Sequence, residues 1–189
     1  QKKFRANSKS AAIHLEPISN FKDSSLRTAR IDDKYRAIIG VPETGTEYYL
    51  LWVDNHDEAM DWARNKLFNW NENTHTAQIF TAINQEEIAE YQTSAEDPSL
   101  FGQYSEDNLL AIGVPQQSLK LVQSLRNLDE LDDVEKYLPS EAYERLFYLV
   151  DGLNIEILLA EIKEGKSSSA NHEEQVMSSN NRRFFVEID

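Results

Sequence analysis

Three strand-like segments follow one another between Leu26 and Val53, and only short turns separate them. Asp32 and Asp33 form the first connection, and the sequence PETG at residues 42–45, typical of a turn, forms the second. A parallel return would need a crossover of roughly a dozen residues or more, so these connections predict an antiparallel meander. The alternating segment at residues 75–83 predicts a fourth strand.

A helix is predicted directly after the third strand, from Asp57 to about Glu72. Asn55 or His56 would begin it, and the acidic residues that follow suit the positive end of a helix dipole. Apolar residues recur at spacings of three and four, as on one face of a helix: Met60, Ala63, Leu67 and Trp70.

After about Asn84 the pattern changes to short helices punctuated by glycine and proline. Ser105 and Gly113 are a predicted cap and stop, Pro115 and Pro139 open further helices, and Gly152 and Gly165 end the last two. The predicted core positions are Leu110, Val122, Leu125, Leu146, Leu149, Leu158 and Ile162. The expected fold class is therefore α+β: a small antiparallel sheet with a flanking helix, followed by an all-helical module.

This pattern predicts four parts of the chain. Residues 1–84 form an α+β domain, residues 85–164 an acidic helical module, residues 165–180 a polar flexible linker, and residues 181–189 a lead-in strand. The chain begins with Gln1 and ends in the strand-like FFVEID, so we interpret it as a piece of a longer protein.

The net charge of −14 is unevenly distributed. Residues 1–40 hold nine Lys and Arg against four Asp and Glu, whereas residues 41–189 hold ten against twenty-nine. The basic start is a candidate surface for DNA or RNA phosphates, while the acidic remainder would repel them or serve only solubility. There is no cysteine, which excludes disulfides and thiolate chemistry, and no apolar run long enough to span a bilayer. We therefore expect a cytoplasmic protein without membrane partners.

The segments IHLEPI, SLRTARIDDKYRAII and YYLLWVDNHDEAMDWARNK, in this order, resemble the RelE/ParE-like toxin domain at the N-terminus of certain UvrD/Rep-type superfamily 1 DNA helicases. The helical block is similar to the segment that follows in those proteins, through LLAIGVPQQSLKLVQSL, LDELDDVEKYLPSEAYERL and LNIEILLAEI. RRFFVEID is similar to the lead-in before their ATPase core. The resemblance implies that the parent protein is an ATP-dependent DNA helicase.

Two departures from that family limit what this chain is expected to do. RelE-type domains begin with a pair of helices, and this chain enters only at the end of the second. The phosphate loop G-x-x-x-x-G-K-[ST] does not occur. We therefore expect no cofactor in these residues. ATP and Mg²⁺ are implied for the missing helicase core, which is also an expected partner.

Four cations on adjacent strands are the candidate nucleic-acid-binding residues: Arg27, Arg30, Lys34 and Arg36. RelE-like ribonucleases work without a metal and use cations to hold the scissile phosphate. Tyr35 and Arg36 form a Tyr-Arg pair, and the resemblance implies that Arg36 is the first choice among these cations. Tyr35 is either a further catalytic candidate or a core residue. The alternative is a solvated sheet face with ordinary ion pairs.

His56 is the acid–base candidate nearest these strands, since imidazole suits proton transfer near neutral pH. The competing interpretation is a helix start, in which His56 and Asp57 cap the helix and Asp57 accepts from free backbone N–H groups. The two acids of HDEA would oppose a bound phosphate, so we favour the helix start. The candidates for catalysis are thus Arg36, His56 and Tyr35, none of them established by the pattern.

The remaining aromatic and histidine residues carry less functional information. Trp52, Trp62 and Trp70 are suited to base stacking, but packing fits their positions better. His14, His75 and His172 lack metal-ligand spacing, so we expect no metal site.

Three functions stay open: a non-catalytic accessory region of a helicase, which we favour; a metal-independent ribonuclease; and a regulatory module whose acidic helices mask a basic toxin-like surface. Exposed sheet edges would also allow the isolated chain to form a homodimer.

Overall fold

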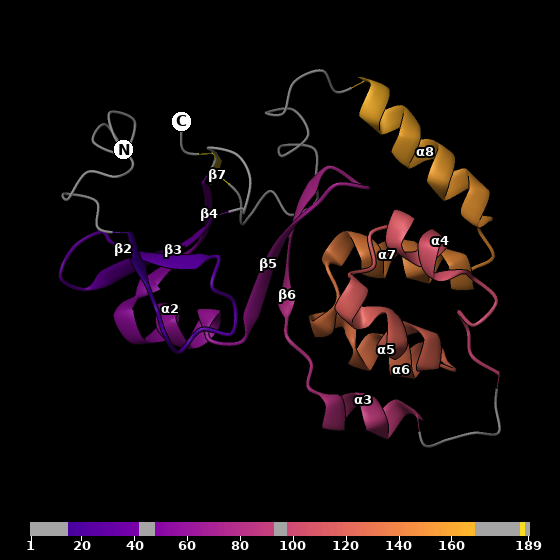
Figure 1. Ribbon diagram of the computed structural model, residues 1–189, viewed down its shortest axis with the longest axis horizontal. Helices are drawn as coiled ribbons and strands as arrows, with labels where there is room; N and C mark the ends of the chain where they lie inside the picture. The colour runs from indigo at the N-terminus through magenta and orange to yellow at the C-terminus, as the bar shows by residue number, and fades with distance from the viewer. Residues whose placement is uncertain (1–14, 42–47, 93–97, 169–185, 188–189) are drawn as a thin grey trace. The chain divides into compact units, whose positions relative to one another are not determined.

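The computed structural model describes residues 15–41, 48–92, 98–168 and 186–187 (Figure 1). Its fold is α+β, as predicted, with a small antiparallel sheet and a set of short helices. The chain divides into two compact units, residues 1–70 with 173–189, called here the sheet unit, and residues 71–172, called the helical unit. This division falls inside the stretch 1–84 that the sequence analysis assigned to one domain, and that assignment stays a prediction.

The sheet unit contains the predicted meander. Its strand order is β1-β2-β3-β4-β7, and all neighbours are antiparallel. The strands are β1 (Leu15–Pro17), β2 (Leu26–Arg30), β3 (Tyr35–Gly40), β4 (Tyr49–Asn55) and β7 (Val186–Glu187). The strand-like end of the chain thus finds its partner in β4, where Tyr49 pairs with Glu187.

Helix α2 (His56–Ala63) follows β4 directly and packs against β3 and β4 (Figure 1). Ala59 and Ala63 are fully buried, and the small side chains allow the helix to approach the sheet closely. The indole rings of Trp52 on β4 and Trp62 on α2 stack at 5.1 Å with an interplanar angle of 7°. The face of the sheet that carries Trp52 is therefore the one that α2 covers.

The predicted helix from Asp57 to Glu72 is wrong in its second half. The helix ends at Ala63, and residues Lys66–Asn71 form strand β5, which pairs with β6 (Thr76–Thr81). The sequence KLFNWN carries two aromatic rings with high strand preference. The ring of Phe68 lies 5.4 Å from that of Tyr49. The spacing of Leu67 and Trp70 imitated a helical face, but tertiary packing favoured the strand.

Two residues of the sheet unit fix β5 in place. The Asp23 carboxylate accepts hydrogen bonds from the Phe68 amide at 2.6 Å and from the Ser25 amide at 2.7 Å, so it joins segments 45 positions apart. At Gly40, an added Cβ would lie 2.9 Å from the Phe68 ring, closer than real Cβ contacts. Glycine is therefore required at position 40 for Phe68 to be buried.

The helical unit consists of β6 and a series of short helices. These are α3 (Gln85–Gln92), α4 (Glu106–Ala111), η1 (Gln116–Ser118), α5 (Leu119–Ser124), α6 (Leu128–Asp133), η2 (Glu135–Tyr137), α7 (Ser140–Val150) and α8 (Ile155–Ser168). No helix in the described part of the chain is long and apolar enough to cross a membrane.

Most of the predicted helix signals are confirmed. The Ser105 hydroxyl accepts from the Asn108 amide at 3.2 Å and caps α4, and Pro139 stands at the N-cap of α7. Gly113 and Gly152 follow helices with φ of 104° and 96°, in the left-handed region that favours glycine. The predicted stop at Gly165 is wrong, because α8 continues to Ser168. The rest of the predicted linker up to residue 180 lies outside the described residues.

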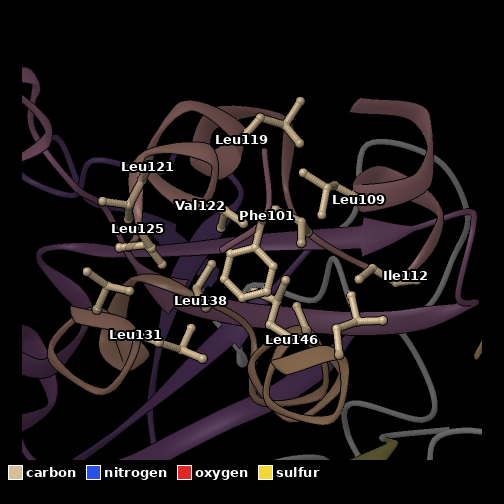
Figure 2. Packing of buried hydrophobic residues seen from close by; sticks show 14 of the residues in the cluster. Phe101, Leu109, Ile112, Leu119, Leu121, Val122, Leu125, Leu131, Leu138 and Leu146 are labelled. Carbon is tan, nitrogen blue, oxygen red and sulfur yellow. The ribbon is translucent and has the colours of Figure 1, made fainter. Parts of the chain in front are cut away.

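The helical unit has a closed apolar core, and Figure 2 shows Phe101 among Leu109, Val122, Leu138 and Leu146. Of the predicted core positions, five are buried and two are partly buried against the same cluster: Val122, Leu125, Leu146, Leu149 and Leu158, then Leu110 and Ile162.

Polar contacts attach β6 to the helices within the helical unit. The Gln78 amide donates to the Gly113 carbonyl at 2.8 Å, and the Arg145 guanidinium donates to the Ile112 carbonyl at 2.9 Å. Arg145 also lies 3.6 Å from the Glu141 carboxylate. Burial raises the pKa of the Glu141 carboxyl, an effect that the Arg145 charge partly offsets.

Candidate nucleic-acid interface on the β2–β3 hairpin

The register of β2 and β3 decides which candidate cations share a face. Arg30 pairs directly with Arg36, and Arg36 pairs with Asp54 on β4. Because side chains alternate along a strand, these three residues lie on the face that carries Trp52 and faces α2. Arg27 pairs with Ile39 and lies on the opposite face, while Lys34 stands in the turn before β3.

The candidate arginines are held by their own hairpin. Arg30 forms an ion pair with Asp33 and donates to the Asp32 carbonyl, and Arg36 donates to the same carbonyl at 2.9 Å. The Arg27 guanidinium donates to the carbonyl oxygens of Ser24 and Leu26. Exposed contacts of this kind stabilise by roughly 1 kcal/mol or less, so a ligand phosphate could replace them.

Asp32 shapes the turn at the end of the hairpin. Its carboxylate accepts from the backbone amides of Lys34 and Tyr35, each at 2.8 Å. The hydrogen bond from Tyr35 and then that from Lys34 lower the pKa of this carboxyl, with smaller contributions from nearby cations. One of the two turn acids is thus turned toward the backbone, and the other, Asp33, is paired with Arg30.

His56 is the first residue of α2, and its environment is that of a helix start. The N-cap is Asn55, whose side-chain oxygen accepts from the Glu58 amide at 3.2 Å. The predicted role of Asp57 as the cap is therefore wrong. Asp57 instead lies 3.0 Å from the His56 ring nitrogen Nδ1, and the His56 side chain is 52% exposed.

The three catalytic candidates lie at the same end of β3 and β4, but two of them are on opposite faces of the sheet. Tyr35 pairs with Asn55, Arg36 pairs with Asp54, and the His56 amide donates to the Lys34 carbonyl at 2.9 Å. However, Tyr35 and Arg36 are consecutive strand residues and point to opposite faces of the sheet. Arg36 and Tyr35 are therefore presented on opposite faces of the sheet at this end of the hairpin.

The tryptophans pack within the sheet unit. Trp52 and Trp62 stack on each other, and the Trp70 ring lies 6.2 Å from that of Tyr49 at 27°. The ammonium of Lys66 lies 5.6 Å from the centre of the Trp62 ring, and burial lowers the pKa of Lys66. This geometry agrees with the packing interpretation of the tryptophans.

No group of three or more His, Asp or Glu side chains within the described ranges is arranged to hold a metal ion. His75 lies in the turn between β5 and β6 with φ of 52°, and His14 and His172 fall outside the described residues.

Sequence reasoning missed a group of exposed apolar side chains near Lys34. Ile31, Tyr35 and Val53 are exposed, and all three lie at the turn end of the sheet, on the face opposite α2. Their strand-like alternation was visible in the sequence, but which face a helix covers was not. We call these three residues the tip patch.

Comparison with protein-family models, with curated proteins and with solved structures gives no match to this chain.

Proposed function

We propose that this chain is a non-catalytic accessory region that precedes the motor of a UvrD/Rep-type, ATP-dependent DNA helicase in the cytoplasm. Its contribution is nucleic-acid or partner binding, and the nucleic-acid surface is the β2–β3 hairpin. ATP and Mg²⁺ belong to the motor, and no chemistry is assigned to the residues of this chain.

The observation that carries the non-catalytic part is the division of the candidate residues between two faces. Arg36 lies on the side of α2 and Tyr35 on the other, while His56 starts a helix beside Asp57. Five acids surround the cations at this end of the sheet: Asp32, Asp33, Asp54, Asp57 and Glu58. Such a setting disfavours the negative charge that develops in phosphodiester cleavage.

The charge of the two units supports binding through the sheet unit. The sheet unit, residues 1–70 with 173–189, holds thirteen Lys and Arg against fourteen Asp and Glu, whereas residues 71–172 hold six against nineteen. Within the hairpin, residues 26–40 carry four cations and two acids. A polyanion is therefore expected to approach the hairpin rather than the helices.

The test is binding of the chain to labelled single-stranded RNA, single-stranded DNA and duplex DNA across a salt series, with the products separated on a gel. Bound but intact nucleic acid, with an affinity that falls steeply with salt, supports the proposal. The variant Arg36→Gln with Arg30→Gln should weaken binding, whereas Lys120→Gln on the helical unit should not.

Two other outcomes correspond to the other functions. RNA that is cleaved in the presence of EDTA, with loss of cleavage in Arg36→Ala, would replace the proposal by a metal-independent ribonuclease. Binding that appears only after residues 85–164 are removed would favour the regulatory module.

A further inference from the structure

We propose that the tip patch is a stacking platform for the bases of a single-stranded nucleic acid, with Tyr35 as the ring and Lys34 as the neighbouring phosphate contact. This inference rests on the proposed function and deepens it, because it names single strands as the ligand class and the face opposite α2 as the place where they bind.

The tip patch is formed by neighbouring side chains on adjacent strands. Ala37 pairs with Val53, so Tyr35 and Val53 lie on the same face of β3 and β4. The Ile31 amide donates to the Tyr35 carbonyl at 3.1 Å, which places Ile31 across from Tyr35 at the end of β2. Their exposures are 55% for Ile31, 39% for Tyr35 and 46% for Val53.

On this face of the sheet, the apolar residues that are exposed lie at the turn end. Ala37 and Ile39 lie on that face farther from the turn and are buried, at 5% and 2% exposure. The accessible apolar surface is therefore confined to the turn end, beside Lys34, while Arg30 and Arg36 lie on the other face of the sheet. An exposed aromatic ring beside apolar side chains and a lysine fits a nucleobase and its neighbouring phosphate.

Lys34 supplies the charge that a nucleotide requires. Its ammonium lies 5.3 Å from the centre of the Tyr35 ring, a cation–π contact on an exposed surface. An exposed contact of this kind is weaker than the stacking of a base on an aromatic ring. A bound base can therefore displace the ammonium, which is then free to contact the adjoining phosphate. Arg27 lies on the same face but farther from the turn, beside Ile39, so Lys34 is the cation at the tip patch.

Stacking on the Tyr35 ring favours a single strand over a duplex. In a duplex the bases are already stacked and their faces are closed, so Tyr35 could contact only the backbone. The aromatic residues of the sheet's other face do not compete for the role, because Trp52 and Trp62 stack on each other.

The experiment measures binding by fluorescence anisotropy with four labelled probes. They are an oligodeoxythymidylate, an abasic phosphodiester strand of the same length, a duplex of that length and an oligouridylate. Tyr35→Ala should weaken oligodeoxythymidylate binding about tenfold and leave the abasic strand unchanged. Tyr35→Phe should retain binding, since it keeps the ring. Lys34→Gln should lower the salt dependence by about 0.7 in log–log slope on single strands.

The matched control is Tyr148→Ala, because Tyr148 is an exposed tyrosine of the helical unit at 50%. It should leave all affinities unchanged, and circular dichroism checks that each variant is folded. Equal losses on the thymidylate and abasic strands, or no loss with Tyr35→Ala, would overturn the stacking platform while leaving nucleic-acid binding intact. Failure of the wild type to bind any of the four probes would overturn both this inference and nucleic-acid binding as the proposed function.

Discussion

The sheet unit and the helical unit bury their apolar residues in different ways. The helical unit closes a core of short helices around Phe101, and seventeen residues in that cluster are buried. The sheet unit covers one face with α2 and leaves the tip patch of Ile31, Tyr35 and Val53 exposed on the other. The helical unit also exposes large apolar side chains, but these are on helices that close its core: Leu128, Phe147, Tyr148 and Ile157. The two units therefore differ in whether a closed helical core or a sheet covered by a helix on one face buries their apolar residues.

Charge follows the same division. The helical unit has an excess of thirteen acids, whereas the sheet unit, with residues 173–189 included, has an excess of one acid. All three tryptophans belong to the sheet unit, so their fluorescence reports on that unit alone. Far-ultraviolet circular dichroism reports mainly on the helices, and the two signals together separate the responses of the two units.

The largest effect is expected from a core substitution in α6. Leu131 is fully buried and Leu128 is 42% exposed, on the same helix. Leu131→Ala should lower the free energy of unfolding by about 3 kcal/mol, since it leaves a cavity, and Leu128→Ala by less than about 0.5 kcal/mol. Urea unfolding followed by circular dichroism measures both. Similar losses in the two variants would mean that the core is not closed as described.

A smaller effect is expected at the two glycines with positive φ. Gly152→Ala should cost about 1 kcal/mol through backbone strain alone, because no atom lies within 4 Å of the added Cβ. Gly113→Ala should cost about 2 kcal/mol, because its Cβ would also lie 3.1 Å from Arg145 and 3.3 Å from Thr74. If urea unfolding gave equal losses for both variants, crowding of the added Cβ against Arg145 and Thr74 would contribute nothing.

In the sheet unit, the start of α2 allows the helix cap Asn55 to be compared with the catalytic candidate His56. Asn55→Ala should lower the free energy of unfolding by about 1 kcal/mol, since it removes the oxygen that accepts from Glu58. His56→Ala should change it by less than about 0.5 kcal/mol. Tryptophan fluorescence during urea unfolding is the measurement, because Trp62 lies on the same helix. The reverse order of the two losses would contradict Asn55 as the cap.

The smallest effect is expected in the pH dependence, where the two units should respond with opposite sign. Backbone hydrogen bonds lower the pKa of Asp32, so its contribution is present above its ordinary value of 3.8 and is lost as pH falls through the lowered pKa. Burial raises the pKa of Glu141, so stability is lost as pH rises from its ordinary value of 4.5 through the raised pKa.

Two variants separate these contributions. Asp32→Asn should flatten the acid limb of stability measured by tryptophan fluorescence, and Glu141→Gln should flatten the decline with rising pH measured by circular dichroism. Arg145, Thr76 and Glu144 interact with Glu141 and are unchanged in that variant. A pH profile of Glu141→Gln that matches the wild type would exclude the buried carboxyl as a cause.

The sequence was most informative where structure is decided locally. Ser105 and Gly152 act on the residues beside them, so a cap and a stop could be recognised without the rest of the fold. Strand β5 could not be recognised in this way. Its strand conformation is favoured by the contacts of Phe68 with Asp23, Gly40 and Tyr49, which all lie outside the segment. Helix α8 continues past Gly165 to Ser168. A glycine therefore ends a helix only where the chain also turns.

The candidate site was predictable in its residues but not in its geometry. The sequence identified Arg30 and Arg36, yet their direct pairing depends on the turn at Asp32, whose side chain bonds the backbone. The exposure of Tyr35 depends on which face α2 covers, and the stacking of Trp52 on Trp62 shows which face that is. Neither could be obtained from composition or spacing.

The Asp23 carboxylate limits the order in which the chain can fold during its synthesis. Its bond to the Phe68 amide cannot form until a ribosome has made the meander, the following helix and the start of β5. Until then a nascent chain carries a meander without the ring that covers Gly40, and its apolar surface is open to other proteins. A pause in translation before Phe68 has left the ribosome would prolong that exposure.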